Sequence, residues 1–296
     1  MSTFSALSPT PAPPDTAPLR VSIQGYTGAF HEVAARAYFG DRPLEVVPAH
    51  TFDDLVEQIV GGTACDLGLM AIENTLAGSL LTNYTRLQEN DLRITGEVYL
   101  RIVQNLLVLP GTTLAELREV HSHPVAIMQC RPFFRAHPHI RLVETVDTAL
   151  SARQLTEDGD RSRGAIAGIL AADIYGLEIL AAGIETNKQN HTRFLVLERG
   201  RYVHQTTAST GNKVSLSITV DHRAGSLHHV LAVLAAYRIN LTKIQSMPII
   251  GRPWEYRLFL DFLATGDVGW HQAVEAIRPL TVELRILGVY QEGTKE

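Results

Sequence analysis

The chain has 296 residues, of which 45% are hydrophobic and 19% charged, and its formal net charge is −5. This length favours about two globular domains with sizeable cores, and the mild acidity disfavours a nucleic-acid partner, which would need a basic face. The sequence contains no apolar run of the roughly 18 residues that a membrane helix requires, so no membrane association is predicted.

The two cysteines, Cys65 and Cys130, are far apart and lack the spacing of metal ligands. Neither a disulfide framework nor a zinc site is predicted, and the cytoplasm, a reducing compartment, is the expected location. His121 and His123 are close enough to share a metal, but no acidic or cysteine partner is near them in sequence. We therefore expect no metal and no cofactor.

Residues 1–20 contain five prolines and have neither a basic nor an apolar segment, so they predict a disordered leader and not a secretory signal. A strand is expected over residues 21–24, then a turn with two glycines, then a helix over 31–39. This geometry directs helix N–H groups at an anion, so a small carboxylate is expected beside the turn that contains Thr27. The alternative is an ordinary tight turn.

A second polar cluster follows residues 67–72, a continuous apolar run that predicts a strand buried on both faces. Ligands of open α/β sheets bind at the carboxyl ends of the strands, so this cluster is a candidate site. The alternative is that its side chains only cap the next helix. The cluster consists of Glu73, Asn74, Thr75, Gly78 and Ser79.

A third cluster, His121-Ser122-His123-Pro124, precedes a helix expected over residues 125–135 that contains Gln129. Ser122 is either the N-cap of this helix or part of a ligand-facing helix start. Because the polar clusters all follow predicted strands, we expect two lobes with a cleft between them. One lobe is expected from residues 21–98 with 181–198, and the other from residues 99–180.

Residues 187–197 begin polar and end as an apolar run, which predicts a loop that leads into a strand. Arg193 offers a planar guanidinium that suits a carboxylate, and Thr192 offers a hydroxyl. Neighbours in a regular strand point to opposite faces, so both can reach one ligand only if the strand begins at about Phe194. The alternative is a surface loop with an ordinary arginine.

Residues 199–212 are polar and aperiodic and predict a linker. Residues 213–291 then show the order β-α-β-β-α-β, which is typical of a ferredoxin-like unit. Such a unit exposes sheet edges and often pairs with a copy of itself.

In their joint order these motifs resemble the prephenate dehydratase family, and the C-terminal segment resembles the ACT regulatory domain of that family. The resemblance extends over about residues 21–290. It rests on Gly25-Tyr26-Thr27-Gly28-Ala29-Phe30, Ile72-Glu73-Asn74-Thr75 with Gly78-Ser79, His121-Ser122-His123-Pro124 with Gln129-Cys130, and Asn190-His191-Thr192-Arg193-Phe194.

The resemblance implies an α/β catalytic region over residues 21–198, shaped like a two-lobed type II periplasmic binding protein, and an ACT domain over residues 213–291. It implies conversion of prephenate to phenylpyruvate, with loss of water and carbon dioxide, in phenylalanine biosynthesis. It also implies a homodimer or homotetramer that phenylalanine inhibits.

For the site, the resemblance implies that Thr192 has the role of the acid, with Arg193, Glu73 and Asn74 beside it. Ground-state binding of the departing carboxylate would not lower the barrier, so Arg193 is expected to hold the pyruvyl carboxylate instead. The expected substrate-binding residues are Thr27, Thr75, Gly78, Ser79, Ser122, His123, Gln129, Asn190 and Phe194. The expected effector-binding residues are Gly225, Ser226, Leu227, Asn240, Leu241 and Ser246.

The C-terminal segment departs from the family pattern at Gln245 and Met247, which are neutral where the family commonly has an acidic and a basic residue. This departure bears on the strength and identity of the effector. Two alternatives to prephenate dehydratase remain: a dehydratase acting on arogenate, which would need an acidic partner for the substrate ammonium, and a non-catalytic amino-acid sensor, which would not need Thr192.

Overall fold

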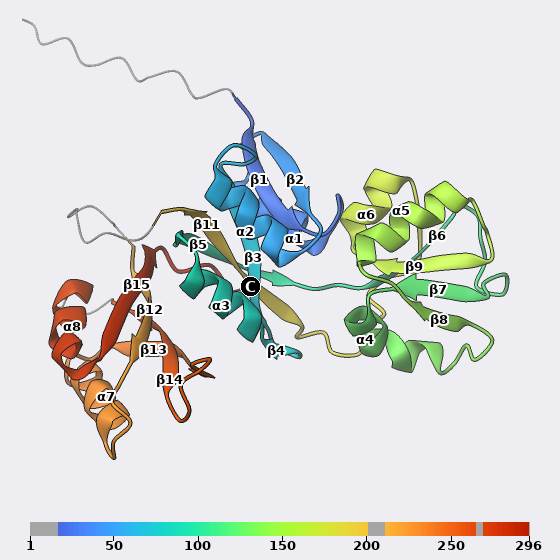
Figure 1. Ribbon diagram of the computed structural model, residues 1–296. Helices are drawn as coiled ribbons and strands as arrows, with labels where there is room; N and C mark the ends of the chain where they lie inside the picture. The colour runs from blue at the N-terminus through green and yellow to red at the C-terminus, as the bar shows by residue number, and fades with distance from the viewer. Residues whose placement is uncertain (1–16, 201–210, 265–268, 296) are drawn as a thin grey trace, which may run out of the picture.

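The computed structural model describes residues 17–200, 211–264 and 269–295. Most of the expected leader and most of the expected linker lie outside these ranges. Figure 1 shows three bodies, a central lobe, a second lobe that contains β6 to β9, and a C-terminal body that contains α7 and α8. The predicted α/β fold, with two lobes followed by a βαββαβ unit, is confirmed.

The first lobe is built on a mixed sheet in the strand order β5-β11-β3-β1-β2. Its first strand begins two residues earlier than expected, because Leu19 pairs with Leu44. The strands are β1 (Leu19–Gln24), β2 (Leu44–Ala49), β3 (Leu67–Asn74), β4 (Gly78–Ser79), β5 (Leu92–Arg101) and β11 (His191–Arg199). The helices are α1 (Phe30–Phe39), α2 (Phe52–Gly61) and α3 (Leu81–Glu89).

Local sequence accounts for the ends of α2. The Thr51 hydroxyl accepts from the Asp54 N–H at 3.1 Å, and the Asp54 carboxylate accepts from the Thr51 N–H at 2.9 Å, a complete capping box. Gly62 ends the helix in the left-handed region at φ +68°. The helix α3 differs, because Leu80 is its N-cap and no side chain caps it. The polar cluster after β3 therefore does not serve as a helix cap.

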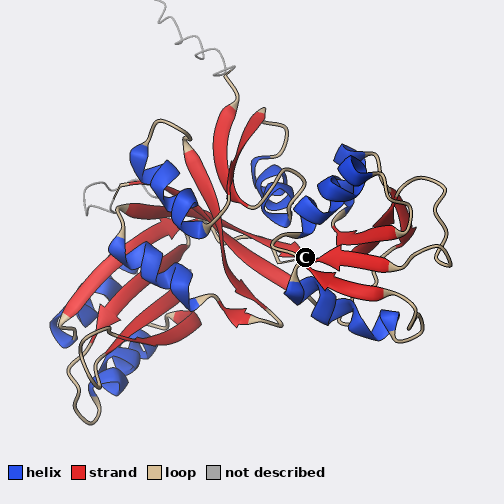
Figure 2. Cartoon of the chain, turned by 45° about the vertical axis from the view of Figure 1, so that its right-hand side comes forward, coloured by secondary structure: helices blue, strands red, loops and turns tan. Residues whose placement is uncertain are grey.

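The second lobe is a separate five-stranded sheet in the order β10-β6-β9-β7-β8. The chain enters it after β5 and leaves it before β11, so segments 102–104 and 182–190 connect the lobes. Figure 2 shows the two lobes beside each other with helices at their junction. The elements are β6 (Asn105–Val108), β7 (Glu119–Ser122), α4 (Pro124–Phe134), β8 (Arg141–Glu144), α5 (Thr148–Asp158), β9 (Arg163–Ala167), α6 (Ile169–Tyr175) and β10 (Glu178–Ala181).

The C-terminal unit continues the sheet of the first lobe, in the order β13-β14-β12-β15-β5. The two sheets meet where Gly288 of β15 pairs with Ile94 of β5, and a Cβ at Gly288 would lie 2.2 Å from the Ile94 carbonyl oxygen. Only glycine permits this approach. The elements are β12 (Lys213–Thr219), α7 (Ser226–Ala236), β13 (Asn240–Pro248), β14 (Tyr256–Leu263), α8 (Trp270–Ile277), the 3₁₀ turn η1 (Arg278–Leu280) and β15 (Glu283–Tyr290).

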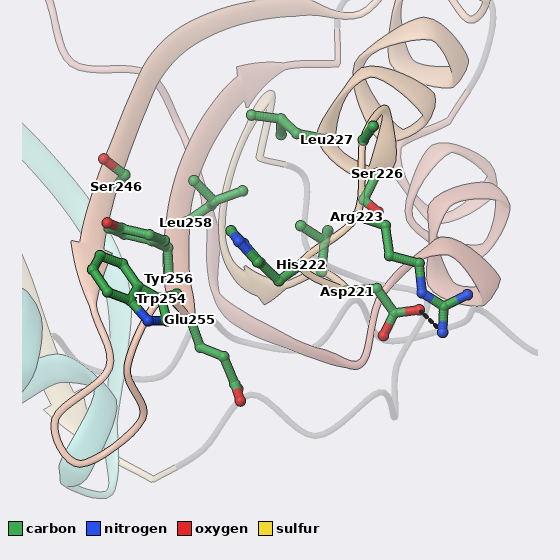
Figure 3. A pocket seen from close by; sticks show the side chains of 12 residues that line it. Asp221, His222, Arg223, Ser226, Leu227, Ser246, Trp254, Glu255, Tyr256 and Leu258 are labelled. Atoms are coloured by element: carbon green, nitrogen blue, oxygen red, sulfur yellow. Dashed lines mark ion pairs between the residues drawn. The ribbon is translucent and has the colours of Figure 1, made fainter.

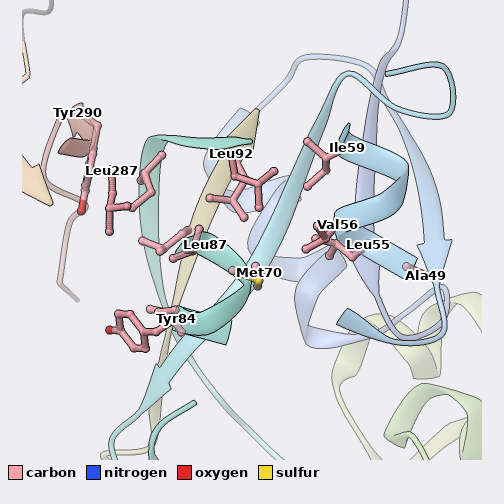
Figure 4. Close-up of a cluster of buried hydrophobic side chains, with 14 of the residues drawn as sticks. Ala49, Leu55, Val56, Ile59, Met70, Tyr84, Leu87, Leu92, Leu287 and Tyr290 are labelled. Carbon is pink, nitrogen blue, oxygen red and sulfur yellow. The ribbon is translucent and has the colours of Figure 1, made fainter. Parts of the chain in front are cut away.

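The C-terminal unit shares a core with the first lobe. Leu287 and Tyr290 of β15 belong to the same buried cluster as Leu87 and Leu92 of the first lobe, as Figure 4 shows. The unit has its own core on the other face of its sheet, beneath α7 and α8. The C-terminal unit is therefore docked on the first lobe through apolar packing, and is not merely tethered to it.

Candidate functional site

A cleft of about 390 Å³ lies between the two lobes, at the carboxyl end of β3 and the start of β11. Phe30, Phe52, Ile102 and Phe194 supply apolar walls. Among the described residues that line the cleft, none is a lysine or an arginine. The polar side chains that line it are Gln24, His31, Asn74, Gln104, His123, Gln129, Asp147, Thr148, Asn190 and Thr192.

Four predicted site residues, Gln129, Asn190, Asn74 and Thr192, form one hydrogen-bonded chain across the cleft. The Asn74 Nδ2 donates to Thr192 Oγ1 at 2.9 Å and to Asn190 Oδ1 at 2.8 Å, and Asn190 Nδ2 donates to Gln129 Oε1 at 3.0 Å. All four were predicted as site residues, and the structure brings them together from β3, β11, α4 and a connection between the lobes.

The direction of this chain is fixed at Asn74. Its Oδ1 accepts the backbone N–H groups of Leu76 and Ala77, both at 2.9 Å, so Nδ2 must be the atom that faces Thr192. The Thr192 oxygen is thereby an acceptor toward Asn74, and its own hydrogen is free to point into the cleft. By the same argument, Gln129 accepts through Oε1 and keeps its Nε2 hydrogens for a ligand.

His123, another predicted residue, is the N-cap of α4 and lines the cleft. Its Nδ1 accepts the Val125 N–H at 3.3 Å, which leaves the hydrogen of a neutral ring on Nε2. His31 has the opposite arrangement, because its Nε2 accepts the Ala71 N–H at 3.4 Å. Its ring packs edge-on against Phe194 with centroids 4.9 Å apart.

We expect His31 to make the protein less stable in acid. Burial lowers the pKa of His31 to about 3, whereas an unfolded histidine titrates near its ordinary value of 6.5. The unfolded chain therefore binds the extra proton below pH 6.5, and stability falls as pH drops from there toward 3. Between pH 7 and pH 5 the loss is expected to be about 1–2 kcal/mol, and to be absent from His31→Phe. Urea unfolding at both pH values measures this; identical pH dependence in the two proteins would contradict it.

The start of α1 gives the cleft an anion-binding element. Its N-cap, Ala29, has no side chain that can cap the helix, and Ala29, Phe30 and His31 all line the cleft. The first N–H groups of a helix have no partner within the helix, and its dipole favours negative charge there. The predicted carboxylate site beside this turn stays a prediction, and Thr27 itself is exposed and does not line the cleft. The Thr27 carbonyl instead accepts from the Tyr175 hydroxyl at 2.7 Å, across the lobes.

The expectation that Arg193 holds a carboxylate in the cleft is wrong. The strand β11 begins at His191, so alternation sends Thr192 and Phe194 to the cleft and Arg193 to the opposite face. Arg193 is 3% exposed, and its guanidinium donates to Glu97 at 2.7 Å, to Asp261 at 2.6 Å and to the Tyr290 hydroxyl at 3.0 Å. It therefore joins the first lobe to the C-terminal unit.

Lys213 and Ser215 of β12 complete this buried interdomain cluster. Lys213 donates to both Glu97 oxygens, at 2.7 and 3.0 Å, and Ser215 donates to Asp261 at 2.6 Å. Burial opposes ionisation of Asp261, yet Arg193 and the Ser215 hydroxyl hold its pKa below the usual value. The cluster thus contains two cations and two anions, which balance in charge.

Four more predicted residues lie on this second face and not in the cleft. Glu73, Thr75, Gly78 and Ser79 line a small pocket with Arg193. Glu73 forms an ion pair with Lys243 of β13, and Ser79 accepts from the same ammonium at 3.0 Å. The Thr75 hydroxyl donates to the Gln189 carbonyl at 2.9 Å. The pairing of β4 with the end of β3 turns this part of the cluster away from the cleft.

Ser122 is also absent from the cleft. It is a buried residue of β7, and its hydroxyl donates to the Ile166 carbonyl at 2.7 Å. His123, not Ser122, caps α4, because β7 continues through Ser122. His31, Gln104 and Asp147 also line the cleft and were not among the predicted site residues. The sequence pointed to these residues only by their positions at the ends of secondary-structure elements. His31 and Asp147 stand at helix starts, and Gln104 precedes a strand.

The predicted effector residues divide between two places in the C-terminal unit. Ser226, Leu227 and Ser246 line a hollow of about 550 Å³ between the start of α7 and the strands β13 and β14, shown in Figure 3. Gly225, at φ +86°, is the N-cap of α7 beside this hollow. Asn240 and Leu241 begin β13, at the end remote from Ser246, and do not line it.

No helix in the described ranges is long and apolar enough to cross a membrane. Across residues 17–200, 211–264 and 269–295, no group of three or more His, Cys, Asp or Glu side chains is arranged to hold a metal ion. Both cysteines are buried free thiols.

The fold and the cleft define a two-lobed α/β protein that encloses a small ligand and has a C-terminal ferredoxin-like domain. Residues 21–201 match the sequence model of the prephenate dehydratase family. The chain belongs to this family of hydro-lyases, and the predicted catalytic family is confirmed.

Two relatives illustrate the range of the family. A bifunctional chorismate mutase/prephenate dehydratase of Enterobacter agglomerans is 30% identical, over 92% of this chain and 70% of its own length. Arogenate dehydratase 1 of Petunia hybrida is 34% identical, over 97% of this chain and 70% of its own length.

Two solved structures match most of the chain. One is prephenate dehydratase of Arthrobacter aurescens in complex with L-Phe, with a TM-score of 0.80, 26% identity, and coverage of 92% of this chain and 90% of that chain. The other is described as GqqA, a novel type of quorum quenching acylases, with a TM-score of 0.81, 30% identity, and coverage of 92% and 97%.

Proposed function

We propose that the chain converts prephenate to phenylpyruvate, water and carbon dioxide. In this reaction the C–C bond to the ring carboxylate breaks, and its electron pair enters the ring as the C–O bond to the ring hydroxyl breaks. The hydroxyl leaves as water when it gains a proton. The observation that carries the proposal is the Thr192 hydroxyl in the cleft, whose oxygen accepts from Asn74 and whose hydrogen is thereby left available to a ligand.

Thr192 supplies a hydrogen bond to the leaving hydroxyl that strengthens as the C–O bond breaks. Gln129 and His123 offer further donors to the substrate, and the start of α1 offers N–H groups to one carboxylate. The described lining lacks lysine and arginine, so no cation holds the departing carboxylate in the ground state. Weak ground-state binding at that point favours its loss.

The test is an assay of purified protein for phenylpyruvate from prephenate, with phenylalanine formation from arogenate measured in parallel. We expect phenylpyruvate to appear with one carbon dioxide for each prephenate consumed. Consumption of neither substrate would refute the proposal.

The free buried thiols support a reducing compartment, and we propose the cytoplasm.

We further propose that the C-terminal unit is an ACT domain in a homodimer or homotetramer, and that phenylalanine binds between two copies and inhibits. The edge strand β13 has exposed residues along its length and can pair with a second copy. The hollow beside Gly225 offers helix N–H groups to a carboxylate. Met247 lies against α3, where its sulfur accepts from the Thr85 hydroxyl at 3.5 Å, so this departure from the family pattern faces the first lobe.

We expect phenylalanine to inhibit the full-length enzyme, and Ser246→Trp, which fills the hollow, to raise the phenylalanine concentration for half inhibition about tenfold or more. Ile250→Trp places the same side chain on an exposed residue outside the hollow and should leave inhibition unchanged. Kinetics with added phenylalanine and mass measurement by light scattering provide the data. Equal inhibition of Ser246→Trp and wild type would rule out this site.

A further inference from the structure

Asp147 is the acidic side chain among the described residues that line the cleft. It is the N-cap of α5, where its Oδ1 accepts the Leu150 N–H at 2.9 Å. Its other oxygen, Oδ2, approaches the first lobe so closely that a Cβ on Gly25 would lie 2.9 Å from it. Asp147 thus spans the cleft from the second lobe to the turn that precedes α1.

The capping role does not account for a charged residue here. Asparagine or serine caps a helix about as well as aspartate, and the helix dipole adds only about 0.3–1 kcal/mol for the negative charge. Burial raises the pKa of Asp147, although the N–H groups of Leu150 and Ala149 and the nearby His123 act in the opposite direction. Among the described residues Asp147 forms no ion pair with a lysine or an arginine, so the titratable cation that faces it is His123. A partly buried carboxylate without a permanent cationic partner is costly unless a ligand supplies the cation.

The neighbouring start of α1 suggests which ligand does so. The same Cβ on Gly25 would lie 3.3 Å from Ala29, the uncapped N-cap of α1. The N–H groups of Gly28, Ala29 and Glu32 already have acceptors, which leaves those of Phe30 and His31 for a ligand. A carboxylate acceptor and these two N–H donors therefore lie side by side at the cleft wall. This pair matches the ammonium and carboxylate that an α-amino acid bears on one carbon. The keto oxygen of an α-keto acid would face the Asp147 carboxylate instead, which is repulsive.

We propose that Asp147 determines substrate specificity by binding the ammonium group of arogenate, so that the cleft accepts arogenate as well as prephenate. This proposal rests on the dehydratase function proposed above. With arogenate, the same C–C and C–O bonds break, and the products are phenylalanine, water and carbon dioxide. Asp147 contacts the part of the substrate that does not react, so it acts on the choice between substrates.

The experiment compares kcat/KM for arogenate and for prephenate in wild type, Asp147→Asn and Asp147→Ser. Both variants keep an oxygen that can cap α5 and lose the charge. We expect kcat/KM for arogenate to fall about 10- to 100-fold, the loss typical of a charge-assisted hydrogen bond, while that for prephenate is unchanged or higher. Asp158→Asn, at the far end of α5 and paired with Arg163, is the matched control and should alter neither value.

The other outcomes of this experiment would contradict the role of Asp147, the proposed function, or both. Turnover of prephenate without arogenate by wild type, or an equal loss of both activities in the variants, would overturn the role of Asp147 and leave the proposed function standing. Turnover of neither substrate by wild type would overturn both. Binding of the two substrates to the Thr192→Ala protein, with and without Asp147→Asn, measures the same preference without turnover. An unchanged ratio of dissociation constants there would also overturn the proposal.

Discussion

Replacement of Thr192 with valine is expected to lower kcat about 10²- to 10⁴-fold and to change KM by less than about threefold. Valine keeps the shape of threonine and removes only the hydroxyl, whose oxygen accepts from Asn74. The lost hydrogen bond matters mainly in the transition state, where negative charge develops on the departing oxygen. Steady-state kinetics with prephenate measures both constants.

Thr95→Val is the matched control for this substitution. Thr95 lies on β5, next to β11, and its hydroxyl bonds to the Val196 carbonyl at 3.4 Å outside the cleft. We expect it to retain wild-type kcat. A kcat close to wild type in Thr192→Val would remove the acid role from Thr192. A rise in KM alone would show that its hydroxyl binds the ground state instead.

The alternation of strands and helices was predictable because each element carries its own signal. The cap at Thr51 and the apolar run of β3 specify a helix start and a buried strand without reference to the rest of the chain. The same holds for the positions of Asn74 and Thr192, which stand where strands open into a cleft. Local signals therefore indicated the chain of hydrogen bonds that crosses the site.

Arg193 could not be placed by such signals. A shift of one residue in the start of β11 exchanges the two faces of the strand, and the polar sequence before Phe194 does not fix that start. The partners of Arg193, Glu97 and Asp261, are 96 and 68 residues away in sequence. A guanidinium that suits a substrate carboxylate suits these side chains equally well.

Asp147 and His31 were missed for a different reason. Asp147 has a sufficient local explanation as a helix cap. His31 lies in the first turn of α1 among apolar residues, and this local sequence contains no motif that indicates a binding site. What makes them part of the site is the approach of the second lobe to the first, which places α5 against the turn at Gly25. That approach depends on tertiary packing that a linear pattern does not specify.

Replacement of Arg193 with leucine is expected to separate the C-terminal unit from the first lobe. The substitution leaves Glu97 and Asp261 buried with Lys213 as their remaining cation in the cluster, and an uncompensated buried charge costs about 3–5 kcal/mol. Both tryptophans, Trp254 and Trp270, lie in the C-terminal unit, so their fluorescence reports its unfolding, whereas far-UV circular dichroism reports the whole chain.

In wild type we expect the two probes to give coincident urea transitions, because the domains share a core and the charge cluster. In Arg193→Leu we expect the fluorescence midpoint to fall by about 1–2 M urea and to precede the circular dichroism transition. Arg278→Leu, which removes an exposed pair with Glu275, should cost less than about 1 kcal/mol. If Arg193→Leu raises KM and leaves the unfolding transitions unchanged, Arg193 binds the substrate and does not link the two domains. Separation of the transitions would identify Arg193 as the link between the strand that bears Thr192 and the domain proposed to bind phenylalanine.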